Sequence, residues 1–88
     1  MEELINQKID YIDKINKARY EISMLKEKKC LERKNAWANA NGTAKEKEDF
    51  VKAQVADVDR EISEHEADIE WYYNMVGIVN DKLVLTDE

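Results

Sequence analysis

The fold is decided by the stretch VKAQVADVDREISEHEADIEWYYNMVGIVNDKL, residues 51–83. Within it, apolar side chains recur at alternating steps of four and three residues, and His65 is the one position that is not clearly apolar. The repeat consists of Val51, Val55, Val58, Ile62, His65, Ile69, Tyr72, Val76, Val79 and Leu83. A sustained 3.5-residue period predicts an α-helix packed against a neighbouring helix in a left-handed coiled coil.

The first half of the chain carries a second repeat of the same kind. Its positions are Met1, Leu4, Lys8, Tyr11, Ile15, Ala18, Ile22, Leu25, Lys29, Glu32 and Ala36. The apolar character weakens at Lys29 and Glu32. Ile5, Ile9 and Ile12 lie beside the repeat and widen the apolar surface beyond what one partner helix covers. We therefore expect something further to pack near the N-terminus.

The two repeats are joined at Asn41-Gly42-Thr43. Gly42 can adopt the left-handed conformation that ends a helix, and Thr43 with Glu46 forms a capping box that begins the next one. Such a short connection makes the helices antiparallel, with facing residue numbers that sum to about 85. Ile22 should then lie near Ile62, while other positions should follow the same register, with Ala18 opposite His65, Ile15 near Ile69 and Cys30 facing Val55.

The predicted fold is all-α, an antiparallel two-helix coiled-coil hairpin in a single domain of residues 1–88. We expect one helix over 3–40, a turn at 41–43, a second helix over 44–80, and a short polar tail at 81–88 that frays. Because the core of 88 residues is thin, we expect no large enclosed pocket. The surplus apolar surface predicts assembly into a homo-oligomer, with a dimeric four-helix bundle as the simplest form.

Composition narrows the functional classes. The net charge is −6, with 20 acidic and 14 basic residues, which disfavours direct binding to nucleic acid. No apolar run is long enough to span a membrane, and the acidic start does not resemble a signal peptide. With a single cysteine, Cys30, the chain is expected in a reducing cytoplasm.

The charges are distributed unevenly between the two arms. Residues 1–41 carry nine basic and seven acidic groups, and residues 42–88 carry five and thirteen. We therefore expect Lys14, Lys17 and Arg19 to face the acidic run of the second helix. The basic stretch near Trp37 is interrupted by Glu27 and Glu32, so a solvated helix face explains it better than a phosphate-binding site; the stretch consists of Lys26, Lys28, Lys29, Arg33 and Lys34.

Residues that could support chemistry are sparse. Glu61 and His65 share a helix face, yet the paired Glu-x-x-His motifs of di-iron bundles are not found. Cys30 is about 35 residues from the one histidine, so a catalytic dyad is not expected. We predict no enzymatic activity, no metal site and no cofactor, and interpret His65 as a polar seam position that specifies register.

Two sets of residues are candidates for binding a partner. The first is an aromatic and apolar group at the end away from the turn, because Trp and Tyr are frequent in interface hot spots; it comprises Ile9, Ile12, Trp71, Tyr72 and Tyr73. The second is an acidic face that could imitate a nucleic-acid backbone; it comprises Asp57, Glu61, Glu64, Asp68 and Glu70.

The segments Arg33–Trp37 and Asn41–Glu48 resemble a pattern in small helical proteins of bacteriophages of Gram-positive hosts, in which a basic residue and Ala precede a Gly-Thr turn and a Glu-rich helix. The resemblance covers about a fifth of the chain. It implies a phage or prophage origin and an accessory role in the cytoplasm of the host cell. We therefore expect a noncatalytic interaction or assembly protein whose partner is another copy or a host protein. The alternatives are an acidic inhibitor of a nucleic-acid-binding enzyme, such as a defence nuclease, and an accessory factor of phage recombination or replication.

Overall fold

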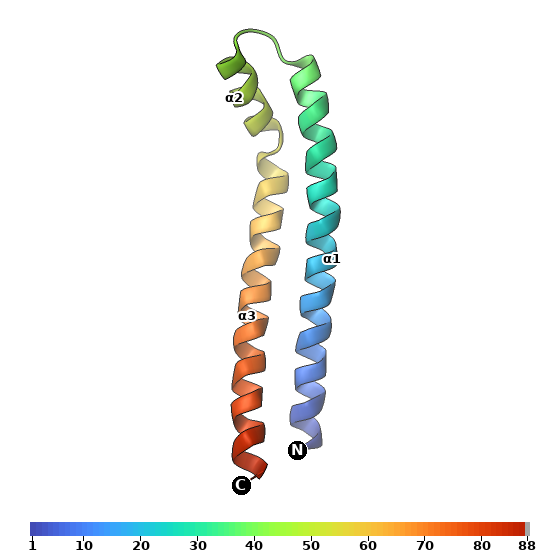
Figure 1. The fold of residues 1–88 in the computed structure, drawn as a ribbon, viewed down its shortest axis with the longest axis vertical. Coiled ribbons are helices and arrows are strands. Elements are labelled where there is room, and N and C mark those ends of the chain that lie inside the picture. Colours follow the sequence, from blue (N-terminus) through green and yellow to red (C-terminus); the bar gives the residue numbers. More distant parts are fainter. Residues whose placement is uncertain (88) are drawn as a thin grey trace.

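The computed structural model describes residues 1–87, and the side chains of residues 1–85. This part of the chain forms the helices α1 (Glu2–Asn39), α2 (Ala44–Gln54) and α3 (Ala56–Asp87). In Figure 1, α2 and α3 together form a second arm that runs antiparallel to α1, so that α3 ends beside the start of α1. The result is an all-α rod of 67 × 18 × 13 Å.

The interface between the two arms, here called the seam, follows both predicted repeats. From Leu4 to Leu83, every position of the repeats is buried or half-buried. Ile22, Val58 and Ile62 form the central cluster, with Leu25 and Ile69 packed against it. Each such aliphatic side chain contributes about 1.5–3 kcal/mol when fully buried. The predicted helix pair and its seam positions from Leu4 onward are confirmed, whereas Met1, the first predicted position, is 55% exposed.

Contacts across the seam fix the register of the arms. The Tyr11 and Tyr72 ring centroids lie 6.0 Å apart, and Lys29 Nζ is 2.5 Å from Asp59 Oδ1. Ala18 and His65 line the same surface depression. These pairs, together with the Ile22–Ile62 cluster, confirm facing residue numbers that sum to about 85.

The second arm bends at Val55, so the prediction of one uninterrupted helix over 44–80 is wrong. Val55 has φ −100° and ψ 5°, outside the helical range. Its N–H still donates to the Val51 carbonyl at 3.1 Å, and the Asp59 N–H donates to the Val55 carbonyl at 3.0 Å. The interruption is therefore a bend between two helices that follow one another directly.

We attribute the bend to packing, since neither Pro nor Gly lies there. The facing seam positions on α1 hold the long charged side chains of Lys29 and Glu32, against which a straight arm would have to bury charge. Bending keeps the apolar side of the arm against α1, with Val51, Val55 and Val58 only 8%, 3% and 4% exposed.

The helix α3 continues to Asp87, beyond the predicted end of the second helix at 80. Residue 88 lies outside the described residues, and fraying of the tail stays a prediction. The helix extends past 80 because Leu83 continues the repeat and is half-buried. Leu4, at the same level of α1, is half-buried as well. The seam therefore extends to the level of Leu4 and Leu83 at the open end of the hairpin.

The turn has the predicted local chemistry. Gly42 adopts φ +106°, and a Cβ built there would lie 2.1 Å from Glu46 Oε2. The Thr43 hydroxyl accepts a hydrogen bond from the Glu46 N–H at 3.3 Å. Glycine at the left-handed position and threonine at the N-cap thus reverse the chain within a few residues.

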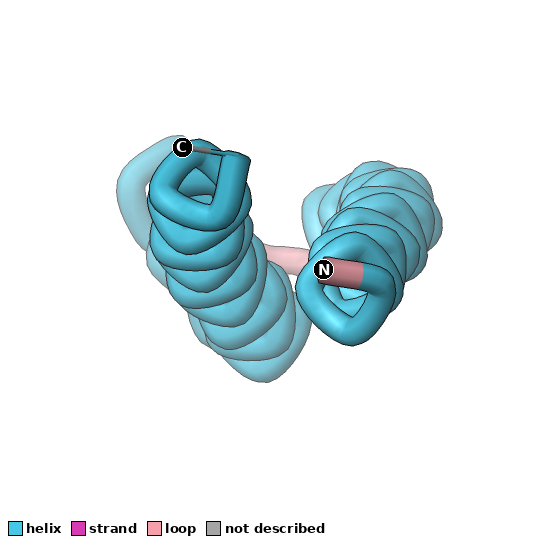
Figure 2. The backbone as a smooth tube through the Cα atoms, turned by 90° about the horizontal axis from the view of Figure 1, so that it is seen from below, coloured by secondary structure: helices cyan, strands magenta, loops and turns pink. Residues whose placement is uncertain are grey.

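Viewed along the rod, the two arms lie side by side as a single layer (Figure 2).

Candidate interaction surfaces

The hairpin has two broad faces, one on each side of the seam. Arg19 and Glu21 are two residues apart, which places them about 200° apart around α1. Arg19 donates a hydrogen bond to the Tyr73 hydroxyl and lies over its ring, while His65 Nε2 is 3.2 Å from Glu21 Oε2. The Arg19 and Glu21 contacts with α3 therefore lie on opposite faces.

The first face, here called the isoleucine face, carries one stripe of α1 and Tyr73 of α3. The stripe follows helical spacing and consists of Ile5, Ile9, Ile12, Arg19, Lys26, Cys30, Arg33 and Trp37. Ile5, Ile9 and Ile12 are 44%, 52% and 39% exposed. These three side chains therefore form an apolar patch that the hairpin itself does not cover, and their exposure to water adds no stability to the folded monomer.

The opposite face, here called the tryptophan face, carries a stripe of the second arm: Phe50, Gln54, Asp57, Glu61, Glu64, Asp68, Trp71, Met75, Ile78, Lys82 and Leu85. Trp71 packs edge-on against Tyr11 at 6.2 Å and against Tyr72 at 5.3 Å between centroids. These contacts fix the indole, yet 54% of Trp71 remains exposed, as does 46% of Ile78. A second apolar patch therefore lies at the same end of the rod.

The structure divides the predicted partner interface between these surfaces. Ile9, Ile12 and Tyr73 lie on the isoleucine face, Trp71 lies on the tryptophan face, and Tyr72 is half-buried in the seam. Trp71 and Tyr73 are two residues apart on one helix, which is why they point in opposite directions. The five residues therefore do not form one continuous surface.

The predicted pairing of Lys14, Lys17 and Arg19 with the acidic run is replaced by other contacts. Lys14 Nζ lies 3.1 Å from Asp10 Oδ2 in its own helix and 5.8 Å from the centre of the Tyr72 ring. The hydrogen bond from Lys14 to Asp10 and the charge of Asp10 raise the pKa of this lysine. Lys17 lies beside Asp68 in a shallow depression without a direct ion pair among the described residues.

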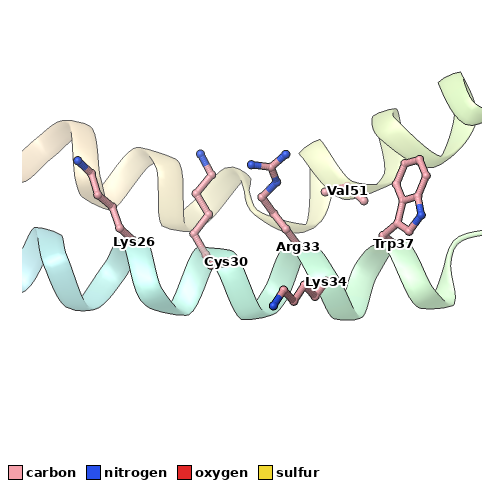
Figure 3. A pocket seen from close by; sticks show the side chains of 7 residues that line it. Lys26, Cys30, Arg33, Lys34, Trp37 and Val51 are labelled. Carbon is pink, nitrogen blue, oxygen red and sulfur yellow. The ribbon is translucent and has the colours of Figure 1, made fainter.

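Basic side chains line a groove at the turn end of the isoleucine face. The groove has a volume of about 660 Å³ and lies between α1 and α2. Its lining consists of Lys26, Lys29, Cys30, Arg33, Lys34, Trp37 and Val51. Figure 3 shows Lys26, Arg33 and Trp37 extending from α1 toward the second arm, whereas Lys34 points away from them.

The groove modifies two expectations. Cys30 is exposed in this lining and does not face Val55, because Lys29 takes the seam position and pairs with Asp59. The basic stretch is more than a solvated helix face, since it combines with Trp37, which is 46% exposed, around a concave surface. Helical spacing of Lys26, Arg33 and Trp37 was visible in the sequence, but the bend that opens the groove was not.

Most of the predicted acidic face is one continuous stripe. Asp57, Glu61, Glu64 and Asp68 follow helical spacing on the tryptophan face and are all exposed. Glu70 lies on the opposite side, three residues before Tyr73. Arg60 is 3.5 Å from Asp57 and 3.9 Å from Glu64, an arrangement of weak surface pairs that neutralises little of the stripe.

The remaining candidates for chemistry do not gather into a site within the described part of the chain. His65 is half-buried beside Glu21, which gives this seam position a polar partner. Among residues 1–87, no group of three His, Cys, Asp or Glu side chains is placed to hold a metal ion. None of the helices in the same range has a stretch apolar and long enough to cross a membrane.

Comparisons with protein-family models, curated proteins and solved structures found no match to this chain. The resemblance to small phage proteins therefore stays a prediction. What the two faces can bind must be argued from their own residues.

Proposed function

We propose that the chain is a noncatalytic assembly protein that associates with further copies of itself through the apolar patches at the open end of the hairpin. The observation that carries the proposal is the exposure of large apolar side chains on both faces at the open end of the hairpin, Ile5, Ile9 and Ile12 on one face and Trp71 and Ile78 on the other. Contiguous exposed apolar patches are typical of surfaces that bind another molecule. A role in an infected host cell is consistent with this proposal and rests on the phage resemblance.

The test is the solution mass by light scattering after size exclusion, in low and high salt. We expect assemblies heavier than the 10.4 kDa chain in both conditions, because apolar contacts are not weakened by salt. Replacing Ile9 and Ile78 together by Ser should reduce the mass to that of one chain while the helical circular dichroism is retained. The matched control is Tyr20→Ser, since Tyr20 is 66% exposed but lies outside both faces. A wild-type chain that stays monomeric at high concentration contradicts the proposal.

A second function is favoured by the continuous acidic stripe. Four exposed carboxylates at helical spacing could occupy the basic channel of a nucleic-acid-binding enzyme and inhibit it. We expect such inhibition to weaken steeply with salt and to disappear in the double variant Glu64→Lys, Asp68→Lys. Reversing Glu2 and Glu3 to Lys instead provides the control, because it makes the same change of net charge outside the stripe. Equal inhibition by all three proteins would remove this alternative.

A further inference from the structure

We infer that copies of the chain stack with all turns at the same end, so that the isoleucine face of each hairpin packs on the tryptophan face of the next. Because two different faces meet, this contact is called head-to-tail here. This inference rests on the proposed self-association and specifies its geometry. The observation behind it is that two stripes are complementary at each height along the rod. One is the α1 stripe of the isoleucine face, and the other is the stripe of the second arm on the tryptophan face.

The apolar parts of the two stripes lie at the same height along the rod. In the observed register, Ile12 is level with Trp71, and Ile5 is level with Ile78. Ile9 is likewise level with the half-buried Met75. If a second hairpin is stacked on the isoleucine face of the first and shifted sideways by about one helix diameter, roughly 10 Å, its α3 stripe comes to lie over the α1 stripe of its neighbour. Each exposed isoleucine then meets a large apolar side chain.

The charged parts of the stripes match at the same time. On the isoleucine face, Arg19 and Lys26 follow the isoleucines toward the turn. At the heights of these two side chains, the tryptophan face carries its acidic residues: Asp57, Glu61, Glu64 and Asp68. The contact that joins apolar to apolar at the open end therefore joins cation to carboxylate in the middle, which fixes both the direction and the register of packing.

The turn end extends the match. Trp37, on the rim of the basic groove, is 46% exposed, and Phe50, on the tryptophan face at a similar height, is 41% exposed. The groove beside Trp37 provides the concave surface, and the exposed ring of Phe50 on the neighbouring copy provides the convex one. Both ends of the rod thus carry an aromatic or aliphatic pair that only a neighbouring copy brings together.

A closed two-fold dimer satisfies fewer of these groups. Two isoleucine faces meeting each other would leave Trp71 and Ile78 of both copies in water. Two tryptophan faces meeting each other would place Asp10, which shares that face of α1, close to the apolar stripe of α3. A head-to-tail contact either closes into a ring or continues as an open array. In a ring both faces of every copy are covered, and in an open array only the two end copies keep one face uncovered.

The experiment uses two full-length variants, each blocked on one face. The first carries Ile9→Asp and Lys26→Glu on the isoleucine face. The second carries Ile78→Asp and Glu61→Lys on the tryptophan face. Every substituted residue is exposed, and circular dichroism establishes that both hairpins remain folded. We expect each variant alone to be monomeric by native mass spectrometry, and an equimolar mixture to form a complex of one copy of each, joined through the two unblocked faces.

The outcomes separate this geometry from the general proposal. A wild-type chain that is monomeric at all concentrations overturns self-association and the head-to-tail geometry together. A wild-type dimer that survives in one of the two variants, with no mixed complex, overturns only the head-to-tail geometry and establishes a closed contact. A third variant blocked on both faces is the control. It should form no complex with the second variant, because its substituted tryptophan face cannot bind the free isoleucine face of the second variant.

Discussion

Isoleucine is used in two different ways along the same helix. In α1, Ile15 and Ile22 are 3% and 8% exposed, whereas Ile5 and Ile9, about two to five turns away, are 44% and 52% exposed. The two pairs differ in the angle at which they leave the helix, toward the second arm or beside it. Burial within one chain is therefore decided by the position of a side chain relative to the seam, and the isoleucines placed beside the seam stay exposed in the hairpin.

The largest expected effect that sharpens this comparison comes from truncating one isoleucine of each kind. Ile22→Ala removes part of the central cluster with Val58 and Ile62 and should lower the free energy of unfolding by about 2–4 kcal/mol. The measurement is urea denaturation at protein concentrations low enough for the chain to be monomeric. Ile9→Ala is the matched control and should change the same free energy by about 0.5 kcal/mol or less.

Comparable losses in the two alanine variants would mean that the patch beside the seam is buried within the monomer. At high protein concentration the roles should differ again, because Ile9→Ala is then expected to weaken association. Ile22→Ala should not affect association once the hairpin is folded.

The two glycines likewise show one residue type in two different positions, a turn and the interior of a helix. Gly42→Ala places a Cβ at a positive φ and against the Glu46 carboxylate, so we expect a loss of about 1–3 kcal/mol in the free energy of unfolding. Gly77 lies within α3 with open space around its Cα, and Gly77→Ala should stabilise the chain by about 0.5–1 kcal/mol. Thermal denaturation measures both, and shifts of the same sign would contradict the assignment of the turn.

The smallest expected effect distinguishes two lysines of neighbouring stripes. Lys29 pairs with Asp59 across the seam, with side chains 32% and 48% exposed. Lys29→Gln should therefore cost about 0.5 kcal/mol at low ionic strength, and less in salt. Lys26→Gln should leave the free energy of unfolding of the monomer unchanged, because Lys26 lines the groove and forms no ion pair with a carboxylate among the described residues. Equal, salt-independent effects would show that the ion pair adds no stability.

Much of this architecture could be predicted from residue spacing. The alternation of steps of four and three identified the seam down to Val79 and Leu83, and Gly42 with Thr43 identified the turn, because both signals are local or periodic. The bend at Val55 could not be predicted in this way, since no Pro or Gly marks it and we attribute it to the charged residues Lys29 and Glu32 on the other arm. The extension of α3 to Asp87 was missed for a related reason, as the polar composition of 81–88 outweighed a single leucine of the repeat.

The two faces were harder to predict than the fold. Spacing alone places Trp71 and Tyr73 on different sides of a helix, but the direction of each side relative to α1 depends on which edge of the seam it joins. The contacts of Arg19 with Tyr73 and of Tyr11 with Trp71 settle that question. Only with both arms in place do the two stripes become surfaces that can be compared height by height.

The bend at Val55 also divides the rod into parts of unequal cooperativity. It separates the 11 residues of α2 from the 32 of α3, and a helix of about 11 residues is too short to persist alone in water. Among its residues, only Val51 is buried. We therefore expect α2 to open as a unit while α1 and α3 remain paired, so that its amide hydrogens exchange with solvent well before those of Ile62 and its neighbours. Since α2 forms one wall of the basic groove, the groove would widen and close on the timescale of this local opening.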